Sequence, residues 1–252
     1  MTRAANGESE ARFSIDGLDW SSSVVPEVRA TGDSDLAGDA RGAVAVRAGA
    51  PNHILVTRDC RSWRDINVAD SDATIEGLAA YRGTFIAVGR RGGDPSWPMA
   101  WWSTDGRDWN VATVEAKAGG SFRAVHAGAR GLVARGAGDF GSGSYWTSPD
   151  GRVWNVSAAN PAERPEGPDP ILALTADGSR LLGQGSSGSD PDGRDIDYWT
   201  SFDGVSWGQL EVSGPERITR NWAIQPFLLR DGVLFNVGQG EPTPAWLGVA
   251  RS

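Results

Sequence analysis

The chain has 252 residues, of which 39% are hydrophobic and 22% are charged, so it can bury one sizeable core within a single domain. Its formal net charge of −8 repels phosphate backbones and anionic membranes, which argues against nucleic acid and membrane surfaces as partners. The 34 glycines and 14 prolines favour many short strands joined by turns over long helices. We therefore expect one all-β domain over residues 1–252, with residues 1–10 as a disordered tail.

The N-terminal sequence has no apolar segment that could act as a signal peptide, and no stretch approaches the roughly 18 apolar residues of a membrane-spanning helix. The single cysteine, Cys60, has no internal disulfide partner, which fits a reducing compartment. Together these features predict a cytoplasmic protein.

A motif with the pattern Ser-x-Asp-Gly-x-x-Trp recurs along the chain. Its copies, which we call box turns, occupy residues 14–20, 57–63, 103–109, 148–154 and 201–207. The copy at 57–63 has Thr57 and Cys60 in place of the serine and the glycine. Successive motif tryptophans are 43, 46, 45 and 53 residues apart, a period typical of propellers and other repeat arrays.

Each copy has the chemistry of a tight turn between two strands. The serine and aspartate side chains can accept hydrogen bonds from the turn's own amides, and glycine adopts a positive φ without steric cost. The tryptophan then packs the returning strand onto its neighbour. We therefore interpret the motif residues as structural.

The motif resembles that of the Asp-box, or BNR-repeat, β-propellers of the sialidase-like superfamily. That family has Ser-x-Asp-x-Gly-x-Thr-Trp in the turn between the third and fourth strands of a blade. The copies here are one residue shorter between aspartate and tryptophan and lack the threonine, as in looser bacterial variants. The resemblance implies a β-propeller in which the box turns lie away from the catalytic face.

Between the box turns lies a second repeated pattern of two apolar runs joined by a turn, at residues 33–48, 75–89, 122–136, 171–185 and 224–238. Each such hairpin, together with the following box turn, predicts a four-stranded sheet. We expect five blades, closed by pairing of the segment 20–25 with the C-terminal strand at 245–250, because closure removes exposed sheet edges. A six-bladed ring, or a longer ring completed by a second chain, also fits, and we expect a monomer or a weak homo-oligomer.

The loops at one end of the predicted blades are long and unequal, whereas the box turns at the other end are short and uniform. The long loops are residues 26–35, 90–98, 137–143, 158–170, 186–197, 214–221 and 239–244. Variable loops on a regular scaffold commonly carry function. We therefore expect the site on this face, around the mouth of the central channel.

Alignment of the hairpins by their turn glycines places five residues at one position near the start of each channel-lining strand: Asp35, Glu76, Arg123, Leu172 and Gln225. Four of the five are polar, which predicts a ring of polar groups at the mouth. The alternative is that Glu76 and Arg123 form an ion pair that only closes the channel.

The loops of this face supply aromatic and polar side chains suited to a small polar ligand. With Asp35 and Gln225, the predicted ligand-binding residues are Asp94, Trp97, Asp139, Phe140, Arg194, Arg217 and Trp222. The favoured function is a module that binds a carbohydrate or another small molecule. An alternative is an enzyme, a glycosidase-like hydrolase or a lyase or cyclase, with Glu76 and Arg123 as catalytic residues. A third is a scaffold that binds another protein.

The sialidase resemblance would imply an arginine triad, a nucleophilic Tyr–Glu pair and an aspartic acid, but this set does not carry over. Tyr81, Tyr145 and Tyr198 all fall on strand or turn positions of the repeat. The two histidines, His53 and His126, lie in different predicted blades, which argues against a histidine metal site. The acidic loop 187–195 is interpreted as solvated, and we expect no metal and no cofactor.

Overall fold

The structure is a computed structural model that describes residues 2–3, 9–13, 18–29, 34–68, 71–93, 96–115, 120–137, 144–156, 171–174, 180–185, 197–210, 227–229, 233–237 and 245–249. Within these ranges the secondary structure is made of strands, so the all-β prediction is confirmed. No helix among the described residues has the length and apolar character needed to cross a membrane.

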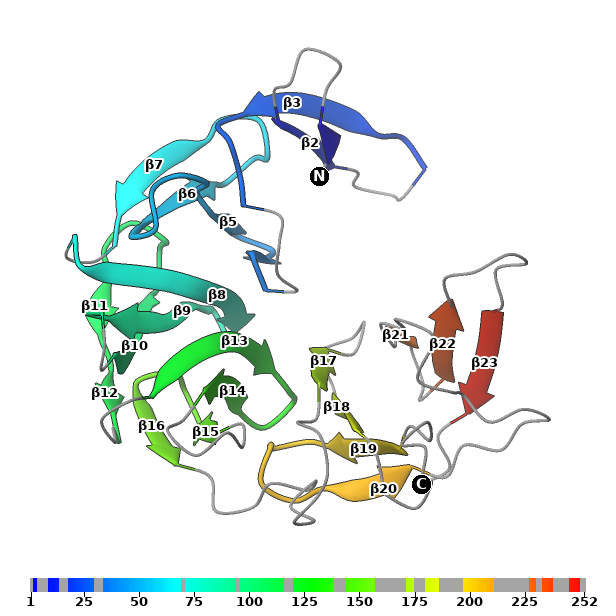
Figure 1. The fold of residues 1–252 in the computed structure, drawn as a ribbon. Coiled ribbons are helices and arrows are strands. Elements are labelled where there is room, and N and C mark those ends of the chain that lie inside the picture. Colours follow the sequence, from blue (N-terminus) through cyan, green and yellow to red (C-terminus); the bar gives the residue numbers. More distant parts are fainter. Residues whose placement is uncertain are drawn as a thin grey trace.

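The strands form six sheets that follow one another around an arc (Figure 1). The first sheet contains β1 (Thr2–Arg3), β2 (Ser9–Phe13) and β3 (Ser21–Val25). The second contains β4 (Leu36–Asp39), β5 (Gly42–Val46), β6 (His53–Thr57) and β7 (Arg64–Asn67). The third contains β8 (Ala73–Tyr81), β9 (Thr84–Arg91), β10 (Trp97–Ser103) and β11 (Asn110–Val111).

The fourth sheet has five strands: β12 (Thr113–Val114), β13 (Ser121–Ala127), β14 (Leu132–Ala137), β15 (Ser144–Ser148) and β16 (Val153–Val156). The fifth contains β17 (Ile171–Leu174), β18 (Leu181–Gly185), β19 (Asp197–Ser201) and β20 (Gly208–Leu210). The sixth contains β21 (Phe227–Leu229), β22 (Val233–Val237) and β23 (Ala245–Val249). The five predicted hairpins are therefore confirmed as β4–β5, β8–β9, β13–β14, β17–β18 and β21–β22.

Neither five blades nor closure of the ring is confirmed, and the described strands form six sheets. β3 pairs with β2, from Ser9↔Val25 to Phe13↔Ser21, while β23 pairs with β22, and no described strand joins the first sheet to the sixth. Figure 1 shows an opening between these two sheets. The strands β1 and β2 lie largely in the segment expected to be a disordered tail. Residues 21–25 of the segment 20–25 pair with β2 in the first sheet. Closure of the ring stays a prediction.

Apolar side chains pack between adjacent sheets. One cluster joins the third and fourth sheets around Phe122, Trp146 and Trp154, where the rings of Phe122 and Trp146 meet edge to face with centroids 4.8 Å apart. A second cluster joins the second and third sheets around Ile75 and Trp101. Neighbouring sheets are thus held together by burial of apolar surface, which is the dominant favourable term in folding.

The third and fourth sheets are also joined by backbone. After β11 the chain leaves its own sheet, and β12 pairs in parallel with β16 of the next. The carbonyl of Glu115 accepts a hydrogen bond from Trp146 Nε1 at 3.1 Å, and its Oε2 accepts one from the Val156 amide at 3.0 Å. This crossing fixes two neighbouring sheets to each other.

The box turns have the predicted turn chemistry. In the copy at 148–154, Ser148 Oγ accepts from the Gly151 amide at 2.8 Å, Asp150 Oδ1 accepts from the Arg152 amide at 2.9 Å, and Trp154 Nε1 donates to the Gly151 carbonyl at 3.0 Å. The copies at 103–109 and 201–207 repeat this pattern. The structural interpretation of these residues is confirmed, whereas residues 14–17 of the first copy lie outside the described residues.

Candidate functional site

The two central residues of the predicted site occupy β-bulges at equivalent places in successive sheets. In β8, Ile75 lies opposite Gly89 and Gly77 opposite Val88, so Glu76 is the extra residue. In β13 the same irregularity falls between Phe122 and Ala124, which makes Arg123 the extra residue. A bulge leaves its extra residue out of the ladder and redirects its side chain. The alignment that gave Glu76 and Arg123 one repeat position is therefore confirmed.

The backbones approach closely beside these bulges. The Leu78 amide donates to the Ser34 carbonyl at 2.6 Å, which brings the segment before β4 against β8. A Cβ atom on Gly77 would lie 2.5 Å from Ser34 Oγ and 3.2 Å from Ala124 Cα. Glycine is required at residue 77 because three segments meet there.

Arg29 connects the segment before β4 to the bulge of β8. Its Nη2 lies 2.6 Å from Asp35 Oδ1 and donates to the Glu76 carbonyl at 2.7 Å, while its Nη1 donates to the Ile75 carbonyl at 2.8 Å. Asp35 is only 5% exposed, so this pairing offsets the cost of burying its charge. Arg29 thus positions both Asp35 and Glu76.

Glu76 lies among three arginines. Its Oε2 is 3.4 Å from Arg29 Nη1, and its Oε1 is 3.5 Å from Arg90 Nε and 4.0 Å from Arg123 Nη1. We call Arg29, Asp35, Glu76, Arg90 and Arg123 the mouth cluster. It contains three guanidinium groups and two carboxylates, and its local charge is opposite in sign to that of the whole chain.

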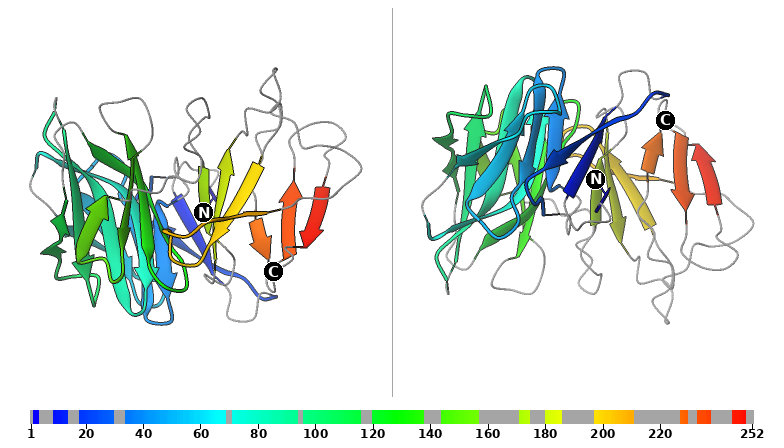
Figure 2. Two further views of the ribbon diagram at one scale, coloured as in Figure 1. Left: turned by 90° about the horizontal axis from the view of Figure 1, so that it is seen from below. Right: turned by 90° about the horizontal axis from the view of Figure 1, so that it is seen from above.

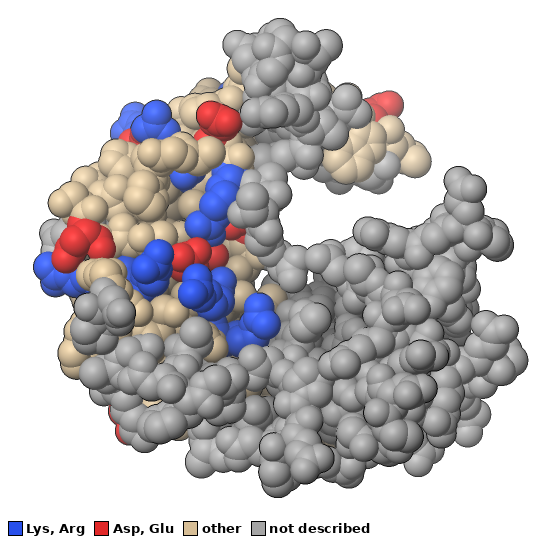
Figure 3. All heavy atoms as spheres, in the orientation of Figure 1, with Lys and Arg blue, Asp and Glu red and all other residues tan. Residues whose placement is uncertain are grey.

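The mouth cluster lies at one end of its sheets. β8 begins near the cluster, and β10 ends in the box turn at 103–109, which lies at the opposite end of the sheet. Seen from the side, the strands cross the thickness of the arc, so each sheet has one end on each face (Figure 2). Basic and acidic side chains gather along the inner border of the described part of the arc (Figure 3).

The structure brings together Asp35, Glu76 and Arg123 among the predicted site residues. The expected ion pair of Glu76 with Arg123 is present, but Arg123 is half exposed, and Arg29 and Arg90 also approach the carboxylate. Trp97 is 46% exposed at the start of β10, opposite Arg91 and at the same sheet end as the cluster. Predicted residues outside the described part of the chain are Asp94, Asp139, Phe140, Arg194, Arg217, Trp222 and Gln225.

Two members of the cluster, Arg29 and Arg90, were not predicted. Both lie in loops that were assigned to the functional face, residues 26–35 and 90–98. Their place in these loops was the sequence feature that could have identified them as site residues. Which loop arginine reaches a given carboxylate depends on the two bulges, which the sequence pattern does not reveal.

The histidines occupy two different environments. His53 Nδ1 is 2.8 Å from Asp65 Oδ1, and Asp65 also pairs with Arg47. His126 is buried in β13, and burial, together with the positive charge of Arg135, lowers the pKa of His126 to about 4. No group of three or more His, Cys, Asp or Glu side chains among the described residues is placed to hold a metal ion.

Comparison with known proteins identifies the class of fold. No protein-family model and no curated protein sequence matches the chain. A puromycin-hydrolyzing peptidase of Mycobacterium tuberculosis is similar in structure, with 15% identity and a TM-score of 0.54 over 96% of this chain and 42% of that one. Trypanosoma rangeli sialidase in complex with the inhibitor DANA has 12% identity and a TM-score of 0.51 over 96% and 50%.

The chain therefore spans half or less of the length of these two proteins. At such identities the likeness concerns the fold alone. The fold is that of a β-propeller, similar to the fold of this sialidase, and its strands pair antiparallel except for β12 with β16.

Proposed function

We propose that the chain binds a carbohydrate or another small polar molecule at the mouth cluster. The observation that carries this proposal is the exposure of the Arg123 side chain and its lack of a close ion-pair partner among the described residues. Its side chain is 53% exposed, and its one ion-pair contact among the described residues is the 4.0 Å approach to Glu76, which is beyond hydrogen-bond distance. A guanidinium group has five N–H donors, and Arg123 can therefore offer most of them to a ligand.

The charge of the cluster favours a ligand with an acidic group. Three guanidinium groups against two carboxylates leave an excess of one positive charge in the cluster. Hydrogen bonds between a guanidinium and a carboxylate are about twice as strong as neutral ones. An acidic sugar combines such a group with hydroxyls that Glu76 could accept from, and Trp97 provides an exposed aromatic surface at the same sheet end.

Catalysis by Glu76 is less well supported by this geometry. A general acid or base needs a carboxyl oxygen free to exchange a proton with the substrate. Both oxygens of Glu76 face arginines, and the other carboxylate of the cluster, Asp35, is buried against Arg29. The arrangement of these carboxylates favours binding over turnover.

The test compares an acidic sugar with its neutral counterpart. Calorimetric titration of the full chain with glucuronate and with glucose should give saturable binding of the acid only. Arg123→Gln should weaken glucuronate binding by about tenfold, the effect of losing one charge-assisted contact. Arg82→Gln is the matched control, because Arg82 is an exposed arginine at the opposite sheet end that contacts the Ala129 carbonyl.

Equal affinity of wild type and Arg123→Gln for glucuronate would contradict binding at the mouth cluster, and equal binding of both sugars would contradict the preference for an acidic ligand. Glu76→Gln separates the enzymatic alternative from it. If a chromogenic glycoside is hydrolysed by the wild type, and Glu76→Gln loses turnover but keeps affinity, the site is catalytic.

A further inference from the structure

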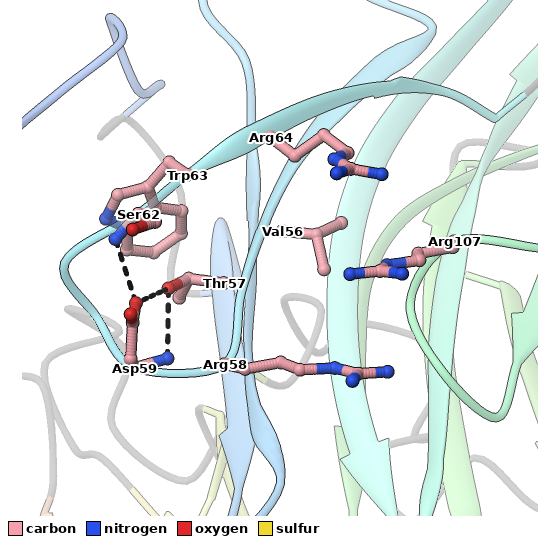
Figure 4. Close-up of a pocket in the computed structure, with 8 residues that line it drawn as sticks. All are labelled: Val56, Thr57, Arg58, Asp59, Ser62, Trp63, Arg64 and Arg107. Atoms are coloured by element: carbon pink, nitrogen blue, oxygen red, sulfur yellow. Dashed lines mark hydrogen bonds between the residues drawn. The ribbon is translucent and has the colours of Figure 1, made fainter.

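A second candidate site lies at the opposite end of the sheets from the mouth cluster. A cavity of about 290 Å³ opens between the second and third sheets, beside the box turn at 57–63 (Figure 4). Its lining residues are Val56, Thr57, Arg58, Asp59, Ser62, Trp63, Arg64 and Arg107. This volume is at the lower limit for small-molecule pockets, so the cavity has room for more than a bare ion.

Three arginines from separate segments line this cavity: Arg58 follows β6, Arg64 begins β7, and Arg107 belongs to the next box turn. Figure 4 shows their guanidinium groups on the same side of Val56. All three side chains are exposed, and among the described residues they form neither ion pairs nor side-chain hydrogen bonds. Three guanidinium groups therefore face one cavity with their donors unused.

Other arginines at this end of the sheets are used within the fold. Arg41 donates to the Thr104 carbonyl at 3.0 Å, and Arg82 donates to the Ala129 carbonyl at 3.0 Å. Arg152 stacks over the ring of Trp102, with its guanidinium carbon 4.3 Å from the ring centroid. The arginines of the cavity differ because they have no such partner among the described residues.

The repeat explains why the cavity exists. Arg107 and Arg152 hold the same place in their box turns, directly after Gly106 and Gly151. Arg152 covers Trp102 of the preceding sheet. One repeat earlier the residue at the position of Trp102 is Val56, whose side chain is much smaller. Arg107 therefore lacks an aromatic ring to cover, and space remains in front of it.

The other two arginines are also departures from the repeat. At the position of Arg58 the other box turns have Ile15, Thr104, Pro149 and Phe202, and at the position of Arg64 they have Ser21, Asn110, Asn155 and Gly208. All of these are uncharged. The two extra positive charges thus occur in the same repeat that has Val56 at the position of Trp102.

We propose that this cavity binds a tetrahedral oxyanion, the group that a phosphate or sulfate ester presents. Guanidinium groups match such oxygens with pairs of parallel hydrogen bonds. The one acidic lining residue, Asp59, is turned to its own loop, since its Oδ1 accepts from Thr57 Oγ1 and from the amides of Arg61 and Ser62. Three positive charges against one negative give the cavity a positive field in an acidic chain.

The test titrates the full chain with inorganic phosphate and inorganic sulfate at constant ionic strength, followed by calorimetry. Wild type should bind at least one of them saturably below ~10 mM. The double variant Arg58→Thr, Arg64→Asn, which carries the residues of the following repeat, should bind at least tenfold more weakly. Glucose 6-phosphate and glucose 6-sulfate then assign the class of ester by which of the two binds more tightly.

Two further variants separate this site from general charge effects. Val56→Trp should abolish binding, because it gives Arg107 the ring that Arg152 has and fills the cavity. Arg152→Gln should bind as the wild type does, because the Arg152 guanidinium is stacked on the ring of Trp102 and does not line this cavity. The proposal is overturned if neither anion saturates the wild type, if the double variant binds equally well, or if Arg152→Gln loses binding to the same extent.

Discussion

The two ends of the sheets differ in how their polar groups find hydrogen-bond partners. At the box-turn end, three copies of the motif close with the same set of hydrogen bonds, and their glycines have φ values of 75°, 82° and 75°. At the mouth end, bulges at Glu76 and Arg123 turn side chains out of the ladder, and Arg29 from a distant loop donates to the backbone of the bulge at Glu76. The three regular box turns satisfy their polar groups locally, whereas the mouth cluster depends on contacts between residues far apart in the sequence.

The two ends therefore differ in the hydrogen-bonding groups that they leave available for a ligand. A box turn leaves few donors or acceptors available, because its serine and aspartate bind its own amides. In the copy at 103–109, the amides of Asp108 and Arg107 lower the pKa of the Asp105 carboxyl, since they stabilise its charged form. The mouth cluster leaves donors available, as Arg123 shows. The cavity beside residues 57–63 is the place where the regular end departs from its own pattern.

The largest expected effect is at a box-turn glycine packed against the preceding sheet. In Gly204→Ala the new Cβ would overlap the Val133 side chain, and the backbone at φ 75° disfavours any Cβ. We expect a loss of about 4 kcal/mol in the free energy of unfolding, from strain and overpacking together. Urea denaturation measures it. Gly49→Ala is the control, because Gly49 has φ 72° with no atom near its Cβ position, and should lose only about 1 kcal/mol. Equal losses would show that packing adds nothing.

The next effect tests the long-range contacts of the mouth end. Arg29→Ala removes a charged partner of the buried Asp35 and the donors to two bulge carbonyls, so we expect a loss of about 3 kcal/mol in the free energy of unfolding. Arg123→Ala is the matched control and should lose less than about 0.5 kcal/mol, since Arg123 is half exposed and 4.0 Å from Glu76. If both variants unfold at the same urea concentration, Arg29 does not organise the cluster.

A third effect concerns the strand between the two ends. His126 keeps its neutral form in the native state down to its pKa of about 4, whereas the unfolded chain takes up the proton below 6.5. Stability is therefore fully present above pH 6.5 and falls as the pH is lowered towards 4. At pH 5 we expect a loss of about 2 kcal/mol relative to pH 7.5 from this residue. Urea midpoints of wild type and His126→Leu at both pH values check it, and an unchanged pH dependence in the variant would contradict the assignment.

The sequence predicted the regular end of the molecule in detail and the mouth end in part. The box turns and hairpins were predicted because each satisfies its own backbone, so a short pattern is sufficient. Glu76 and Arg123 were aligned correctly because each lies near the start of the first strand of its hairpin. Arg29 was missed because its partners come from a bulge 46 and 47 residues away. The β1–β2–β3 sheet was missed because its strands are largely polar and give no apolar alternation.

The smallest expected effect concerns the one irregular box turn. Cys60 has φ 55°, a region that costs a residue with a side chain about 1–2 kcal/mol, and its carbonyl accepts a hydrogen bond from Ser23 Oγ at 2.6 Å. In the regular copies the corresponding carbonyl accepts from the tryptophan, whereas Trp63 Nε1 is buried without a partner in the described part of the chain.

Cys60→Gly should therefore raise the free energy of unfolding by about 0.5 kcal/mol, because relief of the backbone strain exceeds the added entropy of the unfolded glycine. The reverse change, Gly106→Cys, should lower it by about 2 kcal/mol, since its Cβ would also lie 2.9 Å from Val56 Cγ1. Paired urea curves of the two variants measure the difference. If Cys60→Gly destabilises the chain, the cysteine makes a contact that outweighs its strain, and the irregular turn is not simply a weakened copy of the regular one.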